Sequence, residues 1–287
     1  ASSVHPMPGQ WHSVGMLPVF LIGRPLFGAW VVWSVFMQVT ILGCGTSGGV
    51  PRIGNVWGVC DPMEPRNRRL RSSILVQSDT TSLVVDTTPD LREQCLAANL
   101  MHLDAALYTH DHADHVNGID DLRGFMVLQG GRIPVYGGAD TMQSITQRFG
   151  YIFSSARNYP PIATAHLIDG PFRVGDINIE PFRQIHGGMD SLGFRFGNMA
   201  YSTDLNDFPA ESFEKLRELD VWIVDALRPK PHPTHTHLEQ TLEWIAELQP
   251  KRAVLTHMTW DMDYATLCSE LPSGVEPAYD GMVLQFS

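Results

Sequence analysis

The sequence predicts a layered α/β domain, on three observations. Apolar segments of strand length alternate with amphipathic segments of helix length along most of the chain. Polar residues, several of them histidine or aspartate, stand at the carboxyl ends of the predicted strands. The chain has 287 residues, 44% of them hydrophobic, which is enough to bury one large core. We therefore expect a single large domain.

In the first half of the chain, β-branched and other apolar residues mark the predicted strands. The first strand leads into a glycine-rich loop, residues 43–51, which is either an anion cradle of exposed N–H groups or only a structural turn. Pro89 favours the start of a helix. In chain order we expect strands at 37–42, 72–77 and 82–87, a helix at 89–99, a buried strand at 103–109 and a helix starting near Gly118.

The second half of the chain continues the alternation. Apolar residues at helical spacing predict helices at 139–149, 209–219 and 237–248. Two short segments, 192–196 and 199–202, predict a hairpin. Further strands are expected at 133–137, 177–184, 221–224 and 252–256.

Residues 1–36 differ from the rest of the chain, because they are apolar without a clear period. From residue 14 to residue 36 the hydrophobicity approaches that of a membrane span, yet Arg24, Pro18 and Pro25 interrupt it, and no Lys or Arg precedes it as in a signal peptide. We expect this segment to be an upstream extension outside the fold. The domain is then expected to span residues 37–287, with no membrane partner.

Charge and cysteine content narrow the class of protein. The formal net charge of −11 disfavours extended nucleic acid, which is bound through clustered Lys and Arg. It does not exclude a small phosphate ester, because metal ions can supply local positive charge. The four cysteines are scattered and form no CxxC pair, which is typical of a reducing compartment. We expect a cytoplasmic protein.

A histidine-rich run is the most specific signal in the chain. His110, His112, Asp114 and His115 lie within six positions, on a loop between a predicted strand and a predicted helix. Imidazole and carboxylate ligands without thiolate are typical of a hydrolytic site for zinc, manganese or iron. Such a loop can serve two adjacent metal ions.

Three more candidate ligands share one placement. His186, Asp204 and His257 each stand just past the end of a predicted strand. A single histidine at a strand end is usually an ordinary polar residue. Together with the histidine-rich run, however, the three residues indicate one shared site.

The order and approximate spacing of these seven residues resemble the metallo-β-lactamase superfamily of binuclear metallohydrolases. The resemblance covers about residues 37–287 and implies an αββα sandwich, with two divalent ions, zinc or manganese, at the edge between its two sheets. It implies that Asp204 bridges the ions and that Asp86 orients a ligating imidazole. The remaining ligands would divide into His110, His112 and His186 for one metal and Asp114, His115 and His257 for the other.

Within the superfamily, three motifs resemble the phosphoribosyl cyclic phosphodiesterase branch of the carbon–phosphorus lyase pathway. They are the glycine loop, the run Arg-Ser-Ser-Ile-Leu at 71–75 and the run Leu-Pro-Ser-Gly-Val at 271–275. The stretch 233–238 resembles the loop that bears a catalytic histidine in that branch, which implies this role for His235, with His237 as the rival. The branch implies a phosphodiesterase that opens small cyclic phosphate esters of ribose or nucleotides.

The chain departs from this branch at an accessory structural zinc site. The branch holds that zinc with several cysteines after the glycine loop and with a histidine three positions after the last ligand. Here only Cys60 remains, and Trp260 stands at the histidine position. We therefore expect no structural zinc, and the substrate can be a relative of the phosphoribosyl cyclic phosphate.

Several alternatives stay open. A lactone or β-lactam hydrolase would use the same metals but would need no separate acid at His235. A tRNA tail-processing endonuclease shares the metal set but binds a large RNA, and a metal-binding protein without turnover is the rival of another class. Arg71 and Arg123 are candidate phosphate contacts with no assigned role, and a homodimer is left open.

Overall fold

The computed structural model describes residues 37–155 and 159–286. The chain divides into two units, Ala1–Trp33 and Ser34–Ser287, and only the second is described below. The expectation that residues 1–36 form an extension outside the fold therefore concerns residues outside the described ranges, and it stays a prediction.

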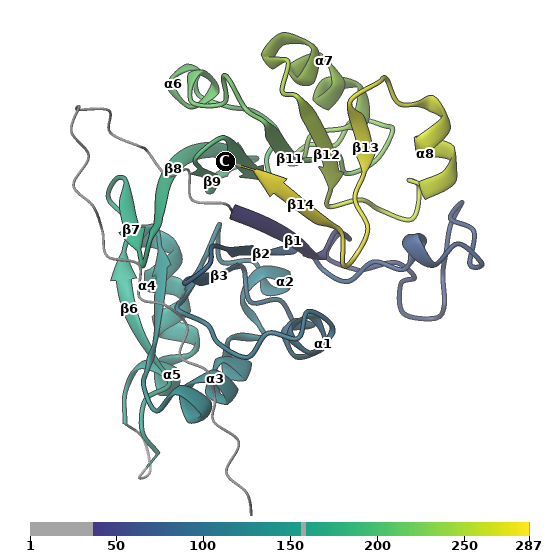
Figure 1. Cartoon of the computed structure of the whole chain (residues 1–287). Helices are drawn as coiled ribbons and strands as arrows, with labels where there is room; N and C mark the ends of the chain where they lie inside the picture. Colours follow the sequence, from purple (N-terminus) through teal and green to yellow (C-terminus); the bar gives the residue numbers. More distant parts are fainter. Residues whose placement is uncertain (1–36, 156–158, 287) are drawn as a thin grey trace, which may run out of the picture. The chain divides into compact units, whose positions relative to one another are not determined.

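The described residues form two seven-stranded sheets, each covered by helices on its outer face (Figure 1). The first sheet has the strand order β14-β1-β2-β3-β4-β5-β6. The helices α1 to α5 and the 3₁₀ turns η1 and η2 belong to this half of the chain. Its strands are β1 (Met37–Gly43), β2 (Ser73–Gln77), β3 (Ser82–Val85), β4 (Ala105–Leu107), β5 (Ile133–Gly137), β6 (Ala163–Leu167) and β14 (Val283–Phe286). The helical elements are η1 (Pro65–Asn67), α1 (Leu91–Ala97), α2 (Ala113–Val116), η2 (Ile119–Asp121), α3 (Leu122–Gln129), α4 (Ala139–Arg148) and α5 (Gly150–Phe153).

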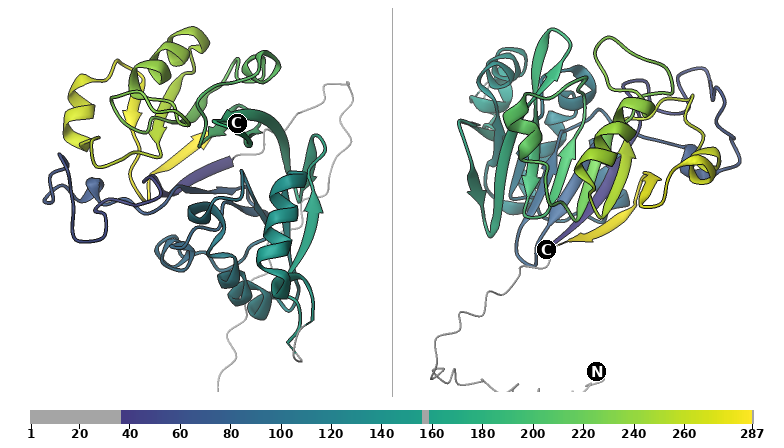
Figure 2. Two further views of the ribbon diagram at one scale, coloured as in Figure 1. Left: turned by 180° about the vertical axis from the view of Figure 1, so that it is seen from behind. Right: turned by 90° about the horizontal axis from the view of Figure 1, so that it is seen from above.

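The second sheet has the strand order β13-β12-β11-β10-β9-β8-β7. Its strands are β7 (Phe172–Val174), β8 (Ile177–His186), β9 (Met189–Phe196), β10 (Met199–Ser202), β11 (Val221–Asp225), β12 (Arg252–Thr256) and β13 (Val275–Pro277). The helices on its side are α6 (Ala210–Glu214), α7 (Leu238–Leu248) and α8 (Tyr264–Glu270). Figure 2 shows the same layers from behind and from above. The expected αββα sandwich of the metallo-β-lactamase fold is confirmed.

Strand direction decides where the polar strand ends meet. In the second sheet β9 pairs antiparallel with both β8 and β10, and β10, β11 and β12 run parallel, so β8, β10, β11 and β12 all point the same way. In the first sheet β3, β4 and β5 are likewise parallel. Parallel strands end at one edge of their sheet. Residues that follow these strands are thereby brought together, although they lie far apart in the sequence.

Two cores hold the layers. One fills the space between the sheets, where it includes Val39 and Phe194, and continues between the second sheet and its helices. Trp222, the largest fully buried side chain of the described residues, lies in this outer part beside Phe208, which packs on Phe213 of α6 and Trp244 of α7. The other packs the first sheet against its helices and includes Leu91 and Tyr108. Strands that are buried on both faces read as continuous apolar runs, which is why β11, with all five residues buried, was recognisable in the sequence.

The structure corrects several predicted elements. The helix expected at 209–219 ends at Glu214, because the next backbone N–H groups bond three residues back and Glu218 then adopts a positive φ of 59°. The sequence also gave no signal for α8 or for the short strands β6, β7, β13 and β14. Edge strands such as β7 and β13 have three residues each, too few for a period-2 pattern.

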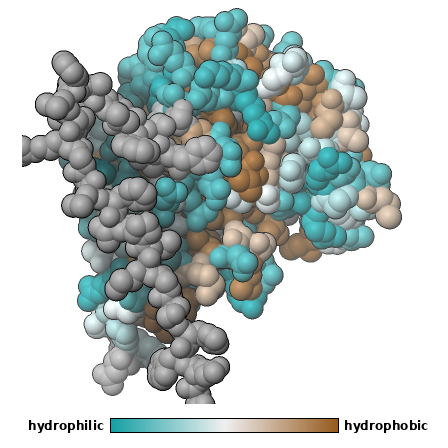
Figure 3. Space-filling model, in the orientation of Figure 1, coloured by the Kyte–Doolittle hydropathy of each residue, from teal (hydrophilic) through white to brown (hydrophobic). Residues whose placement is uncertain are grey.

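The described part of the chain exposes several large apolar side chains. On the visible part of the face in Figure 3, hydrophobic residues alternate with hydrophilic ones. Ile53, Met63 and Met101 are among the large apolar side chains that are more than two-thirds exposed. None of the helices in residues 37–155 and 159–286 combines the length and the apolar character needed to cross a bilayer.

Replacing Trp222 with alanine should lower the free energy of unfolding by about 3–5 kcal/mol, because it leaves a cavity in the core between the second sheet and its helices. It also removes the indole N–H that donates to the buried Ser202 hydroxyl at 3.0 Å. Urea unfolding followed by circular dichroism measures the loss. The matched control is Val283→Ala on β14, which is 52% exposed and should cost less than about 0.5 kcal/mol. Equal losses in the two variants would contradict the core assigned here.

Candidate metal centre

Two candidate ligands, Asp204 and His257, and the orienting Asp86 stand on sharp turns at the strand ends. Asp86 follows β3, Asp204 comes two residues after β10, and His257 follows β12. All three adopt positive φ angles, of 67°, 55° and 55° respectively. Such backbone is sparsely populated by residues other than glycine, and it concentrates at functional sites. His110 and His112 lie on the loop after β4, and Asp114 and His115 belong to α2.

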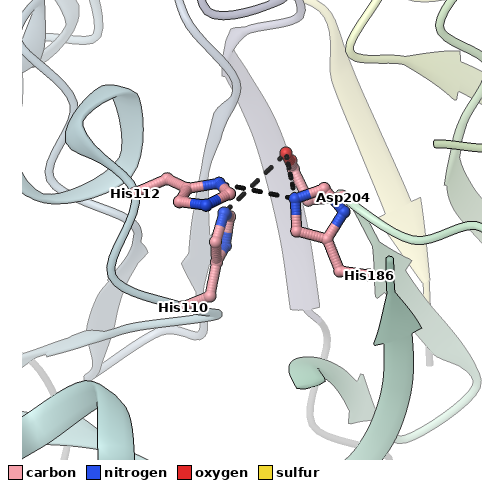
Figure 4. A group of neighbouring side chains, drawn as sticks. All are labelled: His110, His112, His186 and Asp204. Atoms are coloured by element: carbon pink, nitrogen blue, oxygen red, sulfur yellow. Dashed lines mark hydrogen bonds and ion pairs between the residues drawn. The ribbon is translucent and has the colours of Figure 1, made fainter. Parts of the chain in front are cut away.

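The first group of side chains consists of His110, His112, His186 and Asp204 (Figure 4). One donor atom from each residue lies within 4.8 Å of all the others. Asp204 presents Oδ1 to this group, 3.8 Å from Nε2 of His110 and 3.9 Å from Nε2 of His186. Nδ1 of His112 lies 3.4 Å from Nε2 of His186. The four donors therefore surround one point.

The second group consists of His115, Asp204 and His257, all buried. Here Asp204 presents its other oxygen, because Oδ2 lies 3.1 Å from Nε2 of His115 and 3.1 Å from Nδ1 of His257. Asp114 lies beside this group, with Oδ2 3.3 Å from Nε2 of His115. The structure thus brings all seven predicted ligands to one place, and Asp204 divides its two oxygens between the two groups.

Hydrogen bonds fix which nitrogen of three imidazoles faces the centre. His186 donates from Nδ1 to the carbonyl of Thr234 at 2.6 Å, since a carbonyl can only accept. His115 bonds from Nδ1 to Oδ2 of Asp86 at 2.7 Å, and this buried carboxylate also accepts from the Thr109 hydroxyl at 2.8 Å. Because the Thr109 hydroxyl donates its hydrogen to Asp86, its oxygen can only accept, and it accepts from Nδ1 of His110 at 2.9 Å.

In the neutral form these three imidazoles present an unprotonated Nε2 toward Asp204. The Nε2 atoms of His110 and His115 are buried, and within the described ranges nothing forms a hydrogen bond with either. A buried polar atom without a partner is costly. A cation would remove that cost, and nitrogen and oxygen donors suit zinc, manganese or iron. The residues present therefore fit a divalent metal.

Burial and neighbouring charges favour the protonation states that bind a metal ion, which are neutral imidazole and ionised carboxylate, in most of these groups. Burial lowers the pKa of His186 and His257, and burial with the neighbouring His115 lowers the pKa of His110 well below its ordinary value. Burial alone would raise the pKa of Asp204, but the facing imidazoles of His115 and His257 hold it well below its usual range.

His115 differs from the other histidines. Burial lowers its pKa, yet the carboxylates of Asp204 and Asp86 outweigh burial and raise the pKa well above the ordinary value. A metal ion binding to Nε2 would therefore displace a proton from this imidazole, so that affinity for metal rises with pH.

His235 adjoins the centre from the loop between β11 and α7. Its Nδ1 lies 2.9 Å from Oδ2 of Asp225, the buried last residue of β11, which also accepts from the backbone N–H of Asp204 at 3.1 Å. Nε2 of His235 points inward, 3.7 Å from Oδ1 of Asp204, and the ring stacks on His257 with centroids 4.9 Å apart. Burial lowers the pKa of His235, but Asp225 prevails and raises it to about 9.

The rival histidine has a different environment. His237 directly precedes α7, and its carbonyl accepts from the N–H of Thr241 at 3.0 Å. Among the described residues it belongs to neither group of candidate ligands.

His235 also lines a cavity of about 270 Å³. The glycine loop forms one wall, so this loop does face the site. Arg52, Arg228 and His232 were not predicted from the sequence, although His232 stands in the same histidine-rich stretch as His235. The full lining is Thr46, Ser47, Gly48, Arg52, Leu227, Arg228, His232, His235, Thr259, Trp260 and Asp261.

The two arginines considered in the sequence lie outside this lining. Arg71 forms an ion pair with Asp90 at 2.9 Å and donates to the Ser47 carbonyl at 3.2 Å, so it holds the glycine loop from behind. Arg123 pairs with Asp120 at 2.9 Å on the outer side of α3.

Comparison with known proteins identifies the family. The model of the beta-lactamase superfamily domain matches residues 81–258. A structure described as a new diphosphatase from the PhnP family is 38% identical, with a TM-score of 0.82 over 88% of this chain and 97% of that one. Zinc-bound PqqB from Methylobacterium extorquens, at 19% identity, shares the fold with a TM-score of 0.71 over 87% of this chain and 100% of its own.

Two curated relatives add sequence similarity. An octanoyltransferase from Porphyromonas gingivalis is 36% identical over 256 residues, which are 86% of this chain and 51% of that protein. A ribonuclease Z from Bradyrhizobium is 29% identical over 137 residues, 46% of each chain. The chain spans about half the length of the curated relatives it matches. The matched family model, the αββα sandwich and the convergent histidines and aspartates together show that the chain belongs to the beta-lactamase superfamily and has its metallohydrolase fold.

Proposed function

We propose that the protein is a binuclear metal-dependent phosphodiesterase that opens small cyclic phosphate esters of ribose or nucleotides. The observation that carries this proposal is the division of the Asp204 carboxylate, with Oδ1 facing one group of histidines and Oδ2 facing the other. A carboxylate shared in this way suits two cations side by side. The similarity to a PhnP-family diphosphatase supports chemistry at phosphorus.

The proposed ligand sets follow from the two groups. Two divalent ions bound there would lower the pKa of water enough to supply a nucleophile and would offset the negative charge of the phosphate. Zinc and manganese both suit the donor set. One ion is assigned to His110, His112 and His186, the other to Asp114, His115 and His257, and Asp204 serves both.

His235 is proposed as the general acid. A sugar alkoxide is a poor leaving group and needs a proton as the bond to phosphorus breaks. Asp225 accepts from Nδ1 of His235 and thereby directs Nε2, which carries the proton in the imidazolium, toward the centre. The buried carboxylate also stabilises the imidazolium, so the acid stays charged until the leaving oxygen takes the proton.

The cavity beside His235 favours a small substrate. A volume of about 270 Å³ matches a sugar phosphate or a nucleotide fragment rather than a folded RNA. Arg52 and Arg228 on its wall complement a phosphate ester. The formal net charge of −11 further disfavours extended nucleic acid as partner, despite the partial similarity to ribonuclease Z.

Cleavage of a diphosphate bond is a second candidate, which the PhnP-family diphosphatase favours because this chain covers 97% of it. Attack at phosphorus is the same in both reactions, but the leaving group differs. A phosphate monoester leaves as a stable anion and needs no proton. A sugar alkoxide needs a proton in order to leave. Dependence on His235 therefore separates the two activities.

Metal content tests the proposed ligands. Purified protein saturated with zinc or manganese should hold two ions per chain by elemental analysis. Asp204→Ala should lose both ions, because its carboxylate faces both groups, whereas His186→Ala should lose mainly one. Asp111→Asn is the matched control, since this carboxylate lies in the same loop but bonds to Ser144. One ion per saturated wild-type chain, or equal losses in the first two variants, would contradict the bridging role of Asp204.

His235→Ala should keep its metal and its fold but lose about 10²–10⁴-fold in kcat on a 2′,3′-cyclic nucleotide, which needs a proton on its leaving oxygen. The loss should be much smaller on bis(4-nitrophenyl) phosphate and on a dinucleoside diphosphate, whose leaving groups depart as anions. Steady-state kinetics of the metal-loaded protein provide the measurement.

His237→Ala serves as the control for this comparison and should retain activity on all three substrates. Equal losses on all three in His235→Ala would refute the role of this residue as an acid. A larger defect in His237→Ala on the cyclic substrate would transfer the role to that residue.

A further inference from the structure

One wall of the cavity is attached to a separate loop through a buried arginine. We define the strap as residues 57–69, which include η1, and the wall segment as residues 258–264, which follow the metal-ligand candidate His257. Figure 1 shows the strap in blue beside α8. Thr259, Trp260 and Asp261 of the wall segment line the cavity.

Arg69 connects the two segments. Its side chain is only 1% exposed, and its guanidinium donates to the carbonyls of Thr259 at 3.1 Å and Met262 at 2.6 Å. A third bond, at 3.3 Å, goes to Oδ1 of Asn67. These are the two carbonyls that flank Trp260 and Asp261 in the chain. A planar guanidinium with several fixed donors can hold two such carbonyls at once, which an ammonium group does less well.

The neighbours of Arg69 reinforce this connection. Asn67 is fully buried, donates to Oδ2 of Asp263 at 2.7 Å and accepts from the N–H of Tyr264 at 2.8 Å. The carbonyl of Trp260 accepts from the N–H of Val59 at 3.0 Å and from the thiol of Cys60 at 3.4 Å. The strap thus forms hydrogen bonds with five of the seven residues of the wall segment: Thr259, Trp260, Met262, Asp263 and Tyr264.

The strap also packs closely against the Trp260 ring through Gly58. A Cβ atom added at Gly58 would lie 2.0 Å from Cδ1 of the Trp260 ring, and Gly58 has a positive φ of 60°. On the cavity side, the guanidinium of Arg52 lies 4.2 Å from the centroid of the same ring. The indole, which lines the cavity, is therefore held between the strap and Arg52.

Burying a guanidinium costs free energy, and none of the ion pairs among the described residues includes Arg69. Its Nε is buried without a hydrogen-bond partner. An apolar side chain would fill the same space at lower cost. Two of its three hydrogen bonds hold the carbonyls that flank Trp260 and Asp261, and the third holds Asn67, which itself bonds to the wall segment. A costly group used in this way points to a role in placing Trp260.

We infer that Arg69 is a positioning residue for substrate selection: it fixes the wall segment so that Trp260 and Arg52 bound the space for the leaving sugar. This rests on the proposed function, because it assigns the cavity to the leaving group that His235 protonates. Arg69 itself touches neither the cavity nor the candidate metal ligands.

The inference is tested by kinetics of Arg69→Met and Arg69→Lys on a 2′,3′-cyclic nucleotide, at a temperature where each variant is fully folded. Arg69→Met should raise KM about tenfold, with metal content unchanged and kcat lowered much less. Arg69→Lys should recover part of the loss, since an ammonium can reach one carbonyl. Arg68→Met is the matched control, because Arg68 lies in the same strap but stacks on Trp57.

Trp260→Ala distinguishes positioning from general stability. If Arg69 acts through Trp260, the double variant Arg69→Met/Trp260→Ala should have the same KM as Trp260→Ala alone. If Arg69 only stabilises the fold, Arg69→Met lowers the melting temperature without raising KM, and that result overturns the inference. Independent, additive effects on KM overturn it as well.

A readout without catalysis separates this inference from the proposed function. Hydrogen–deuterium exchange of a peptide covering the wall segment should be faster in Arg69→Met than in the wild type, while peptides from β2 and all peptides of Arg68→Met stay unchanged. Unchanged exchange in the wall segment of Arg69→Met refutes the inference, even with active enzyme. If the wild type cleaves no phosphate ester, the proposed function fails, and exchange still reports whether Arg69 holds Trp260.

Discussion

The two oxygens of one buried carboxylate organise the site. Asp204 faces His110 and His186 with Oδ1, and His115 and His257 with Oδ2, so that four imidazoles from three segments are oriented about a single group. The carboxylate can do this because Asp204 turns sharply after β10 and its backbone N–H is held by Asp225. Repulsion among the clustered imidazoles is relieved by the same negative charge.

Much of this arrangement could be predicted from the sequence, because its signals are local. The run from His110 to His115 is dense enough to stand out, and His186, Asp204 and His257 each follow an apolar strand. Strand direction then brings these residues together, because the ends of β8, β10 and β12 lie at one edge of the sheet. The layered fold was predictable for the same reason: buried strands and amphipathic helices each have their own period.

Other parts of the site left no local signal. Thr109 fixes the tautomer of His110 only because its hydroxyl donates a hydrogen bond to Asp86, a carboxylate at the end of another strand. Asp225 reads in sequence as an ordinary strand end, and its contact with His235 depends on a ten-residue loop folding back. Arg69 reads as one of several arginines in a polar stretch, and only burial sets it apart. Partners of this kind are defined by tertiary packing, which a single sequence does not reveal.

The candidate ligands come from both halves of the sandwich: His110 and His115 lie in the segment that follows β4 of the first sheet, His186 ends β8 of the second sheet, and His257 follows β12. A cation bound among them would therefore cross-link the two sheets. Its binding free energy would add to the free energy that keeps the layers together. Metal supply would then affect how fast the protein is degraded. When metal is scarce, the chain would open more often between its layers and expose inter-sheet surface to proteases.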